Sequence, residues 1–195
     1  MRQRTQERCA RIREVLEKRQ PDLTLVMDNI HDPHNVSAIL RSCDAFGVYK
    51  VHLYYTTEAF PTIGGKSSAS SRKWVYREKH TDPGETVETL HSQGLRIVGT
   101  GFGSRAIPLT QWDLSQPSAI ILGNEHSGLS PELKERIDTE LFIPMQGMVQ
   151  SLNVSVAAAV ILYEAWRQRQ LKGMYQSPSL ETPLLETTFR EWEKK

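Results

Sequence analysis

The sequence has few cysteines, almost no net charge and no long apolar run. Its two cysteines, Cys9 and Cys43, lie far apart, so neither a disulfide framework nor the paired spacing of a zinc site is present. No stretch approaches the roughly 18 consecutive apolar residues that a membrane span requires, and residues 1–5 do not open a secretory signal. We therefore expect a cytoplasmic protein that uses no metal, and we take both cysteines as packing residues.

Charge is nearly balanced, at a formal net value of +1, but the positive residues are clustered. Residues 1–20 hold seven Lys or Arg against three Glu, and residues 63–80 hold five against one. Local basic patches on a nearly neutral chain suit a catalyst that binds and releases a polyanion. A solvated helix face produces the same pattern, so charge alone leaves both interpretations open.

Segments with the apolar pattern of a strand and segments with that of a helix follow one another along the chain. The 195 residues are enough to bury one hydrophobic core. Strands are predicted at residues 23–28, 51–55, 96–100, 119–122 and 141–144. Helices are predicted at residues 9–16, 35–46 with Asn35 as N-cap, 82–92, from the Ser130-Pro131 pair onward, and 154–171. This order predicts an α/β fold, a mostly parallel sheet with helices on both faces. The Gly- and Ser-rich segment 64–71 cannot pack, so we expect it to be mobile.

A first polar cluster, residues 31–37, leaves a predicted strand and enters a helix. Loops after strand ends are where α/β sheets place their chemistry. His31 and His34 have a spacing found in metal sites, but the intervening proline and the lack of a third ligand favour another role. Arg41, about two turns into the helix, is either a functional cation or an exposed charge on an amphipathic helix.

A second cluster, residues 120–128, is a buried strand that runs into two glycines on either side of an acid. Gly123 permits a close approach that a Cβ would block, which places Glu125 at the edge of the sheet. A loop between two glycines is a weak signal by itself.

A third cluster, residues 143–156, joins a strand to the longest predicted helix. Its methionine-containing loop is apolar and adaptable, which suits a flat ligand the size of adenine, and the helix N-terminus offers unpaired N–H groups. Ser151 is either a residue of this site or a simple N-cap.

Together the three clusters resemble the ordered motifs of the SpoU RNA 2′-O-methyltransferases. The matching residues are Asn35 with Arg41, then Gly123-Asn124-Glu125-x-x-Gly128, then Ile143-Pro144-Met145-x-Gly147-Met148-x-x-Ser151-Leu152-Asn153-Val154-Ser155. The resemblance extends from about residue 11 to about residue 173, and residues 19–24 are similar to the members that methylate the tRNA D-loop. Asp32 and His126 depart from it, since family members often carry a basic residue and a lysine there.

The resemblance implies a homodimer in which about residues 120–160 form a C-terminal trefoil knot. It divides the chain into a basic N-terminal helix at residues 1–20 that contacts tRNA, a methyltransferase domain at residues 21–173, and a C-terminal tail or helix at residues 174–195. The knot could not have been predicted from the apolar periodicity, because knotted chains are rare.

The resemblance also implies S-adenosylmethionine as cofactor, tRNA as partner, and a guanosine ribose, conventionally number 18, as methyl acceptor. Another tRNA or rRNA nucleotide is the alternative target. The implied catalytic residues are Asn35, Arg41, Glu125, Ser151 and Asn153. The implied cofactor residues are Thr100, Gly101, Gly123, Ile143, Met145, Gly147, Met148, Ser151 and Leu152. The implied RNA-binding residues are Arg8, Arg11, His34, Arg167 and Arg169.

A guanidinium is effectively never deprotonated in proteins, so Arg41 is expected to position the ribose and not to act as the base. Glu125 would orient Arg41 or Asn35, and Asn153 would orient the hydroxyl. An RNA phosphate oxygen or a water would take the proton.

Two other functional classes fit parts of the chain. The run at residues 99–103, Gly-Thr-Gly-Phe-Gly after a strand, suggests a nicotinamide-dependent oxidoreductase, but it lacks the G-x-G-x-x-G spacing and the later acidic residue. A non-catalytic RNA-binding module is the second, and the presence of Asn35, Arg41 and Glu125 argues against it.

Overall fold

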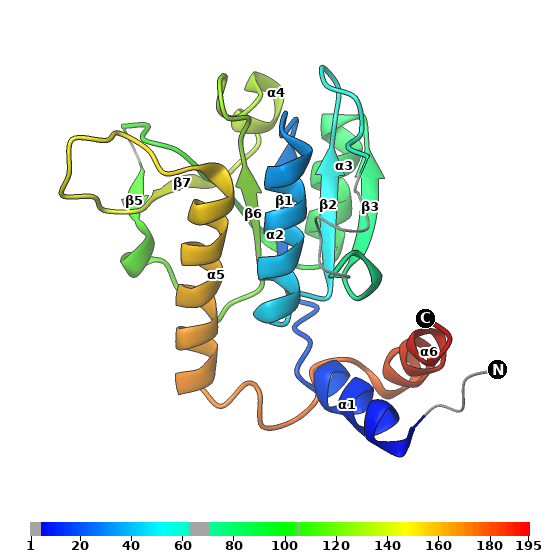
Figure 1. The fold of residues 1–195 in the computed structure, drawn as a ribbon. Coiled ribbons are helices and arrows are strands. Elements are labelled where there is room, and N and C mark those ends of the chain that lie inside the picture. The colour runs from blue at the N-terminus through cyan, green and yellow to red at the C-terminus, as the bar shows by residue number, and fades with distance from the viewer. Residues whose placement is uncertain (1–4, 63–70, 105) are drawn as a thin grey trace.

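A parallel seven-stranded sheet forms the centre of the computed structural model, which describes residues 5–62, 71–104 and 106–195 (Figure 1). The strand order is β3-β2-β1-β6-β4-β7-β5, and every neighbouring pair is parallel. The strands are β1 (Leu23–Asp28), β2 (Lys50–Tyr54), β3 (Tyr76–His80), β4 (Arg96–Thr100), β5 (Ile107–Pro108), β6 (Ser118–Leu122) and β7 (Thr139–Phe142). The predicted α/β class is confirmed.

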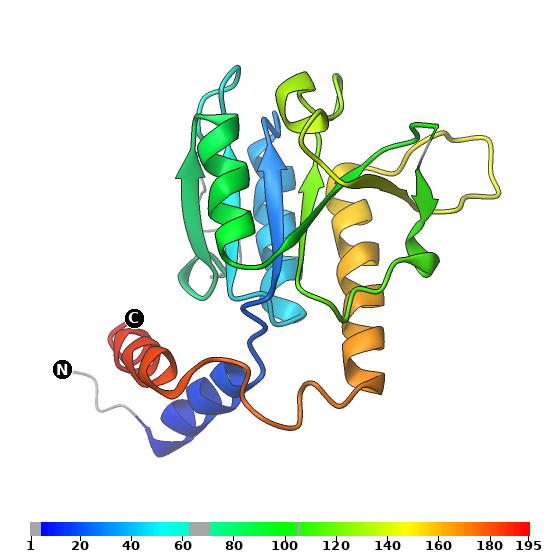
Figure 2. The same ribbon diagram turned by 180° about the vertical axis from the view of Figure 1, so that it is seen from behind.

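Helices cover both faces of the sheet (Figures 1 and 2). The helices and 3-10 turns are α1 (Gln6–Glu17), α2 (Pro33–Ala45), η1 (Ser71–Lys73), α3 (Pro83–Ser92), η2 (Leu109–Gln111), α4 (Pro131–Lys134), α5 (Val154–Leu171) and α6 (Thr182–Glu193). The α2 and α5 helices lie side by side on one face, over a core that includes Leu25 and Met27 of β1. Val26 of β1 faces the opposite side, where α3 contributes Leu90. All six residues of β1 are buried, on one face or the other, which explains why most of them are apolar.

The α1 and α6 helices pack against each other below the sheet (Figure 1). Their shared core includes Leu16 and Trp192, and the Tyr49 hydroxyl lies 3.0 Å from Thr188 Oγ1. The two ends of the chain therefore form one small unit next to the main domain. None of the helices in the described ranges is long and apolar enough to cross a membrane.

Most predicted elements are confirmed, with β1, β4 and α5 at the predicted bounds. The strand predicted at residues 141–144 begins two residues earlier, as β7. The edge strands β3 and β5 were missed, because β3 has three consecutive charged residues at its centre and β5 has only two residues. The segment 64–71 lies outside the described residues except for Ser71, which begins η1.

Candidate active site

A cavity of about 430 Å³ lies where the carboxyl ends of β4, β6 and β7 meet the start of α5. Its lining includes Thr100, Gly101 and Phe102 after β4, Gly123, Asn124 and Glu125 after β6, Ile143 and Met145 after β7, and Ser151, Leu152, Asn153 and Val154 at α5. Carboxyl ends of parallel strands are the usual place for ligands in α/β sheets, because the loops there converge. The second and third sequence clusters thus meet at one cavity.

A chain of hydrogen bonds joins all three clusters beside this cavity, which Glu125 and Asn153 line and Asn35 does not. Asn35 Nδ2 donates to Glu125 Oε1 at 2.8 Å, and Asn153 Nδ2 donates to Asn35 Oδ1 at 3.1 Å. The Glu125 carboxylate also accepts from the backbone N–H groups of His31, at 2.9 Å, and Asp32, at 3.4 Å. These hydrogen bonds connect three polar side chains that come from distant parts of the sequence. We refer to Glu125, Asn35 and Asn153 as the amide chain.

Glu125 is ionised at neutral pH. Burial would raise its pKa, but the hydrogen bonds from Asn35 and from the backbone of His31 and Asp32 outweigh burial and lower the pKa below its usual value. A carboxylate that accepts several N–H bonds is held in one orientation. Glu125 therefore orients Asn35, one of the two roles predicted for it; no hydrogen bond joins it to Arg41 among the described residues.

Helix capping explains how two members of the amide chain are placed, and it corrects two sequence predictions. The N-cap of α2 is Asp32, whose Oδ1 accepts from His34 N at 2.8 Å, whereas Asn35 lies within the first turn. The N-cap of α5 is Asn153, not Ser151: its Oδ1 accepts from Ser155 N at 2.9 Å. Capping uses the oxygen of Asn153 and leaves its Nδ2 for Asn35.

Sequence reasoning missed the residues that hold the loops around the amide chain. Asn124 Nδ2 donates to Asn29 O at 2.6 Å, and Asn124 Oδ1 accepts from His126 N at 2.8 Å. A Cβ on Gly123 would overlap the backbone of Gly128, so this turn requires glycine. The signal for Asn124 was in the second cluster, but the sequence could not show its partner.

Asn29 is the second missed residue, and it has a positive φ of 48°. Its Oδ1 accepts from the backbone N–H groups of Thr56, Thr57 and Glu58 at 2.9, 3.0 and 3.2 Å. Asparagine tolerates this left-handed conformation better than most residues. Asn29 therefore connects the loop after β1 to the loop after β2, beside the first cluster.

The predicted cofactor residues divide into two groups. Thr100, Gly101, Gly123, Ile143, Met145, Ser151 and Leu152 line the cavity, and Thr100 Oγ1 donates to Ile121 O at 3.1 Å. Gly147 and Met148 do not line it: they lie in the exposed part of the loop before α5, and Met148 is fully exposed. A cofactor contact by either residue stays a prediction.

Arg41 makes no hydrogen bond or ion pair with the other predicted catalytic residues in the described part of the chain. It is exposed on α2 and does not line the cavity, and within the described ranges no hydrogen bond or ion pair joins it to another residue. An exposed guanidinium with no local partner is available to a ligand or to another chain.

Four predicted RNA-binding residues lie at least partly on the surface. Arg11 pairs with Glu14 at 2.7 Å on α1, and Arg167 pairs with Glu164 at 2.8 Å on α5. Arg8 is half-buried and donates to the Glu193 carbonyl at 3.3 Å, while His34 is exposed at the start of α2.

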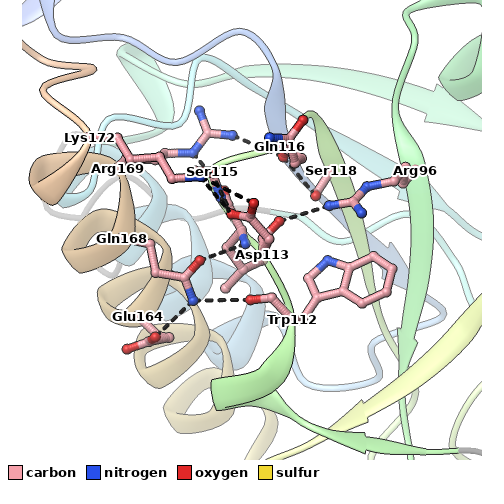
Figure 3. A network of polar contacts seen from close by, with 11 residues as sticks. Arg96, Trp112, Asp113, Ser115, Gln116, Ser118, Glu164, Gln168, Arg169 and Lys172 are labelled. Atoms are coloured by element: carbon pink, nitrogen blue, oxygen red, sulfur yellow. Dashed lines mark hydrogen bonds and ion pairs between the residues drawn. The ribbon is translucent and has the colours of Figure 1, made fainter.

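The prediction that Arg169 binds RNA is wrong for this chain, because its side chain is fully buried. The guanidinium donates to Leu114 O at 2.9 Å, Gln20 Oε1 at 2.9 Å and Asp22 Oδ1 at 2.5 Å. Figure 3 shows Arg169 on α5 within a network of polar contacts, where its guanidinium also reaches the Gln116 carbonyl at 3.4 Å. Arg167, two residues earlier on α5, is exposed, and because a helix turns about 200° between such positions the two arginines face different sides.

His31 and His34 belong to no group of three possible metal ligands in the part of the chain that the structure describes, and His31 Nδ1 lies 3.2 Å from Glu58 Oε1. One group within the described residues has metal-like geometry, His52, Glu78 and His80 on β2 and β3, with ligand atoms within 4.8 Å of one another. Its three residues already contact other side chains or one another: His52 Nδ1 lies 2.8 Å from His80 Nε2, and Glu78 pairs with Lys50 at 2.8 Å. This group does not line the cavity.

The fold and the site define an α/β protein with a ligand cavity at the carboxyl ends of parallel strands. Residues 22–163 match the sequence pattern of the SpoU rRNA methylase family, and the chain belongs to this family. In the oxidoreductase alternative a helix should follow the glycines, but the next element after β4 in the described residues is the strand β5.

Known proteins are similar over most or all of the chain. It is 45% identical over 195 residues to a tRNA (guanosine(18)-2'-O)-methyltransferase of Thermus thermophilus, covering 100% of both chains. The crystal structure of the A. aeolicus TrmH/SpoU tRNA modifying enzyme superposes with a TM-score of 0.90 at 41% identity, covering 96% of this chain and 95% of that one. The SpoU methyltransferase AviRb from Streptomyces viridochromogenes, in complex with the cofactor AdoMet, superposes with a TM-score of 0.70 at 29% identity, covering 79% and 59%.

Proposed function

We propose that this protein transfers a methyl group from S-adenosylmethionine to the ribose 2′-hydroxyl of a tRNA guanosine, with guanosine 18 as the target. The amide chain beside the cavity is the observation that carries the proposal. The full-length similarity to the Thermus enzyme supports tRNA and this nucleotide. Another tRNA or rRNA nucleotide is the alternative target.

The cavity fits S-adenosylmethionine in size and lining. A volume of about 430 Å³ lies within the range of roughly 300–1,000 Å³ for small-molecule sites. Ile143, Met145 and Leu152 offer apolar surface for the adenine, and the loops at residues 100–101 and 151–153 offer backbone groups for the polar parts. When bound, the cofactor supplies a methyl group activated by its sulfonium.

The amide chain is suited to hold the ribose. Asn35 and Asn153 each use one N–H for the neighbouring side chain, which leaves each amide a second N–H for a ribose oxygen. Because both amides are held on both sides, the ribose hydroxyl is positioned without a large loss of side-chain entropy. Ser151, in the cavity lining, is the remaining residue we assign to this site.

Arg41 is assigned the phosphate of the nucleotide, which a guanidinium can contact with two parallel hydrogen bonds. Arg41 cannot serve as the base. The Glu125 carboxylate is engaged by three N–H groups, so a phosphate oxygen or a water takes the proton of the hydroxyl.

We further propose that the protein is a homodimer and that Arg41 reaches the cavity of the second copy. Two features support this: Arg41 does not line the cavity of its own chain, and Val156, Val160 and Tyr163 expose apolar surface on α5. The trefoil knot at about residues 120–160 is proposed from membership of the family.

The tRNA is proposed to contact the unit formed by α1 and α6, together with His34 and Arg167. Arg8 and Arg11 lie on α1, within the basic residues 1–20. We keep residues 21–173 as the methyltransferase domain and residues 174–195 as the C-terminal segment, which contains α6.

Transfer assays with labelled S-adenosylmethionine and either bulk tRNA or rRNA test the reaction, and mass spectrometry of the digested RNA locates the methylated ribose. We expect label in tRNA from the native protein and at least about 100-fold less from Asn153→Ala, by analogy with the loss of one positioned donor. An exposed variant, His91→Gln on α3, is the control. Absence of label from native protein that binds the cofactor contradicts the enzyme proposal, and label in rRNA alone contradicts the tRNA target.

A further inference from the structure

We infer that Glu140 on β7 is a positioning residue for the cofactor, because its buried carboxylate holds the backbone of residues 101–103 as one wall of the cavity. The inference rests on the proposed function of that cavity. It assigns a role to a side chain that does not itself line the cavity.

The Glu140 carboxylate connects two segments that are far apart in sequence. The residue is 7% exposed. Its Oε2 accepts from Gly103 N at 2.6 Å, and its Oε1 lies 3.0 Å from Lys134 Nζ on α4. The carboxylate therefore fastens the loop after β4 to the end of the sheet, with one lysine balancing its charge.

The cavity lies across the 101–103 loop from this carboxylate. On β7 Leu141 belongs to the core on the α5 side, so Glu140, the preceding residue, points to the other face of the sheet. Gly101 N donates to Leu141 O at 3.0 Å, which brings the loop over the strand. The loop residues Gly101 and Phe102 line the cavity. Displacing the loop from Glu140 thus moves the cavity wall.

Glycine spacing shows how close this approach is. A Cβ built on Gly101 would lie 2.6 Å from Glu140 Oε1, and a Cβ built on Gly103 would overlap Oε2. Gly101 and Gly103, which are separated by one residue, therefore leave room for the Glu140 carboxylate against the loop backbone. From the sequence alone this glycine run resembles an incomplete dinucleotide motif, and nothing in the sequence connects it with Glu140.

A buried carboxylate costs free energy unless it is paired and hydrogen-bonded, and an apolar side chain would fill the same space at lower cost. What an apolar side chain cannot do is orient the Gly103 N–H, because this needs an acceptor. A wall held in place before the ligand arrives reduces the ordering cost of binding. Loss of Glu140 should therefore weaken cofactor affinity and leave the transfer step unchanged once the cofactor is bound.

The test compares Glu140→Ala, Glu140→Gln and Gly103→Ala in the full chain. Calorimetry with S-adenosylmethionine gives the Kd, and steady-state assays separate KM for the cofactor from kcat and from KM for tRNA. We expect at least a tenfold weaker Kd for Glu140→Ala and for Gly103→Ala, with kcat at saturating cofactor and KM for tRNA within twofold of native. Glu140→Gln should recover most of the affinity, because its amide oxygen still accepts from Gly103 N.

Tyr49→Phe is the control for a general loss of stability, since it removes a buried hydrogen bond to Thr188 in the α6 unit. It should lower Tm and leave the Kd unchanged. A Kd within twofold of native for Glu140→Ala overturns the inference, as does equal weakening by Tyr49→Phe. If native protein binds no S-adenosylmethionine, the proposed function itself fails, which is a distinct outcome.

Discussion

At the scale of single residues, the site depends on polar side chains that are held on both sides. Asn35 is 90 residues from Glu125 and 118 residues from Asn153, yet its amide contacts both. Because each amide has two N–H donors and one carbonyl, holding one donor and the oxygen still leaves one donor for a substrate. The arrangement is pre-organised, so its polar groups need little reorientation when a ribose arrives.

Arg41→Ala is expected to lower methyl transfer by at least about 100-fold, as removal of one stabilising donor does in other enzymes. The Kd for S-adenosylmethionine should stay within a few-fold, because Arg41 does not line the cavity of its own chain. Transfer assays and calorimetry measure the two quantities. Arg41→Lys keeps the charge without the planar fork and should restore only part of the activity. A large loss of cofactor affinity in Arg41→Ala would place this residue at the cofactor instead of the phosphate.

Arg169→Met should lower the free energy of unfolding by about 3 kcal/mol, because it leaves Asp22 and several backbone carbonyls without their buried partner. Denaturant titration measures the change. Arg167→Met, two residues earlier on α5, is the matched control and should change stability by less than about 1 kcal/mol, since its ion pair is exposed. Equal stability of the two variants would show that burial of Arg169 contributes little.

At the scale of elements, the strands β2 and β3 at one edge of the sheet hold a pair of histidines that does not line the cavity. His52 on β2 is fully buried, and its Nδ1 lies 2.8 Å from His80 Nε2 on β3. Burial and the neighbouring His80 lower the pKa of His52 to about 4. Burial also lowers the pKa of His80. The β2–β3 pair is thus built for two neutral imidazoles.

This pair should make the protein less stable in acid. The pKa of His52 is lower in the folded chain than its ordinary value of 6.5, so the unfolded chain binds more protons between about pH 4 and 6.5. The stabilisation is complete above pH 6.5 and is lost as pH falls toward 4, by at most about 3 kcal/mol. His52→Phe should flatten this dependence in urea titrations across that window, whereas His91→Gln, at an exposed site, should not. An unchanged slope in His52→Phe would assign the acid sensitivity to other groups.

At the scale of the whole molecule, the surface of α5 and the position of Arg41 point to a partner chain. Val156, Val160 and Tyr163 are exposed on a helix that leads directly from the cavity. An isologous contact between two copies would bury such a surface twice. In the proposed dimer, Arg41 of one copy would reach the cavity of the second copy.

Two inactive variants should therefore complement each other. In a heterodimer of Arg41→Ala and Leu152→Asp subunits, one composite site carries both lesions and the other carries neither, so about half of native activity should return. Leu152→Asp places an unpaired charge in the cavity lining. Co-expression with two different tags gives the purified heterodimer, and each homodimer serves as its control. If each site lay within one subunit, every site would keep a lesion, and a folded heterodimer without activity would contradict the shared site.

The sequence by itself determined most of the elements in their order, apart from β3 and β5, and the segments that form the candidate site. Apolar runs such as residues 23–28 predict a buried parallel strand because both faces need apolar side chains. The motif residues around Asn35, Glu125 and Asn153 identified the family from their order alone. These features are local, or they belong to the one-dimensional pattern, and reading them requires no knowledge of distances.

Only the tertiary structure decided which residues contact one another. It placed Asn153 and Asp32 as the caps, buried Arg169 in place of exposing it, and set Glu140 beside Gly103. Each outcome depends on packing between elements that are distant in sequence, such as β7 against the loop after β4. Charge and residue type do not predict such contacts, because the same arginine or glutamate is stable either on the surface or in the interior where its polar groups are hydrogen-bonded.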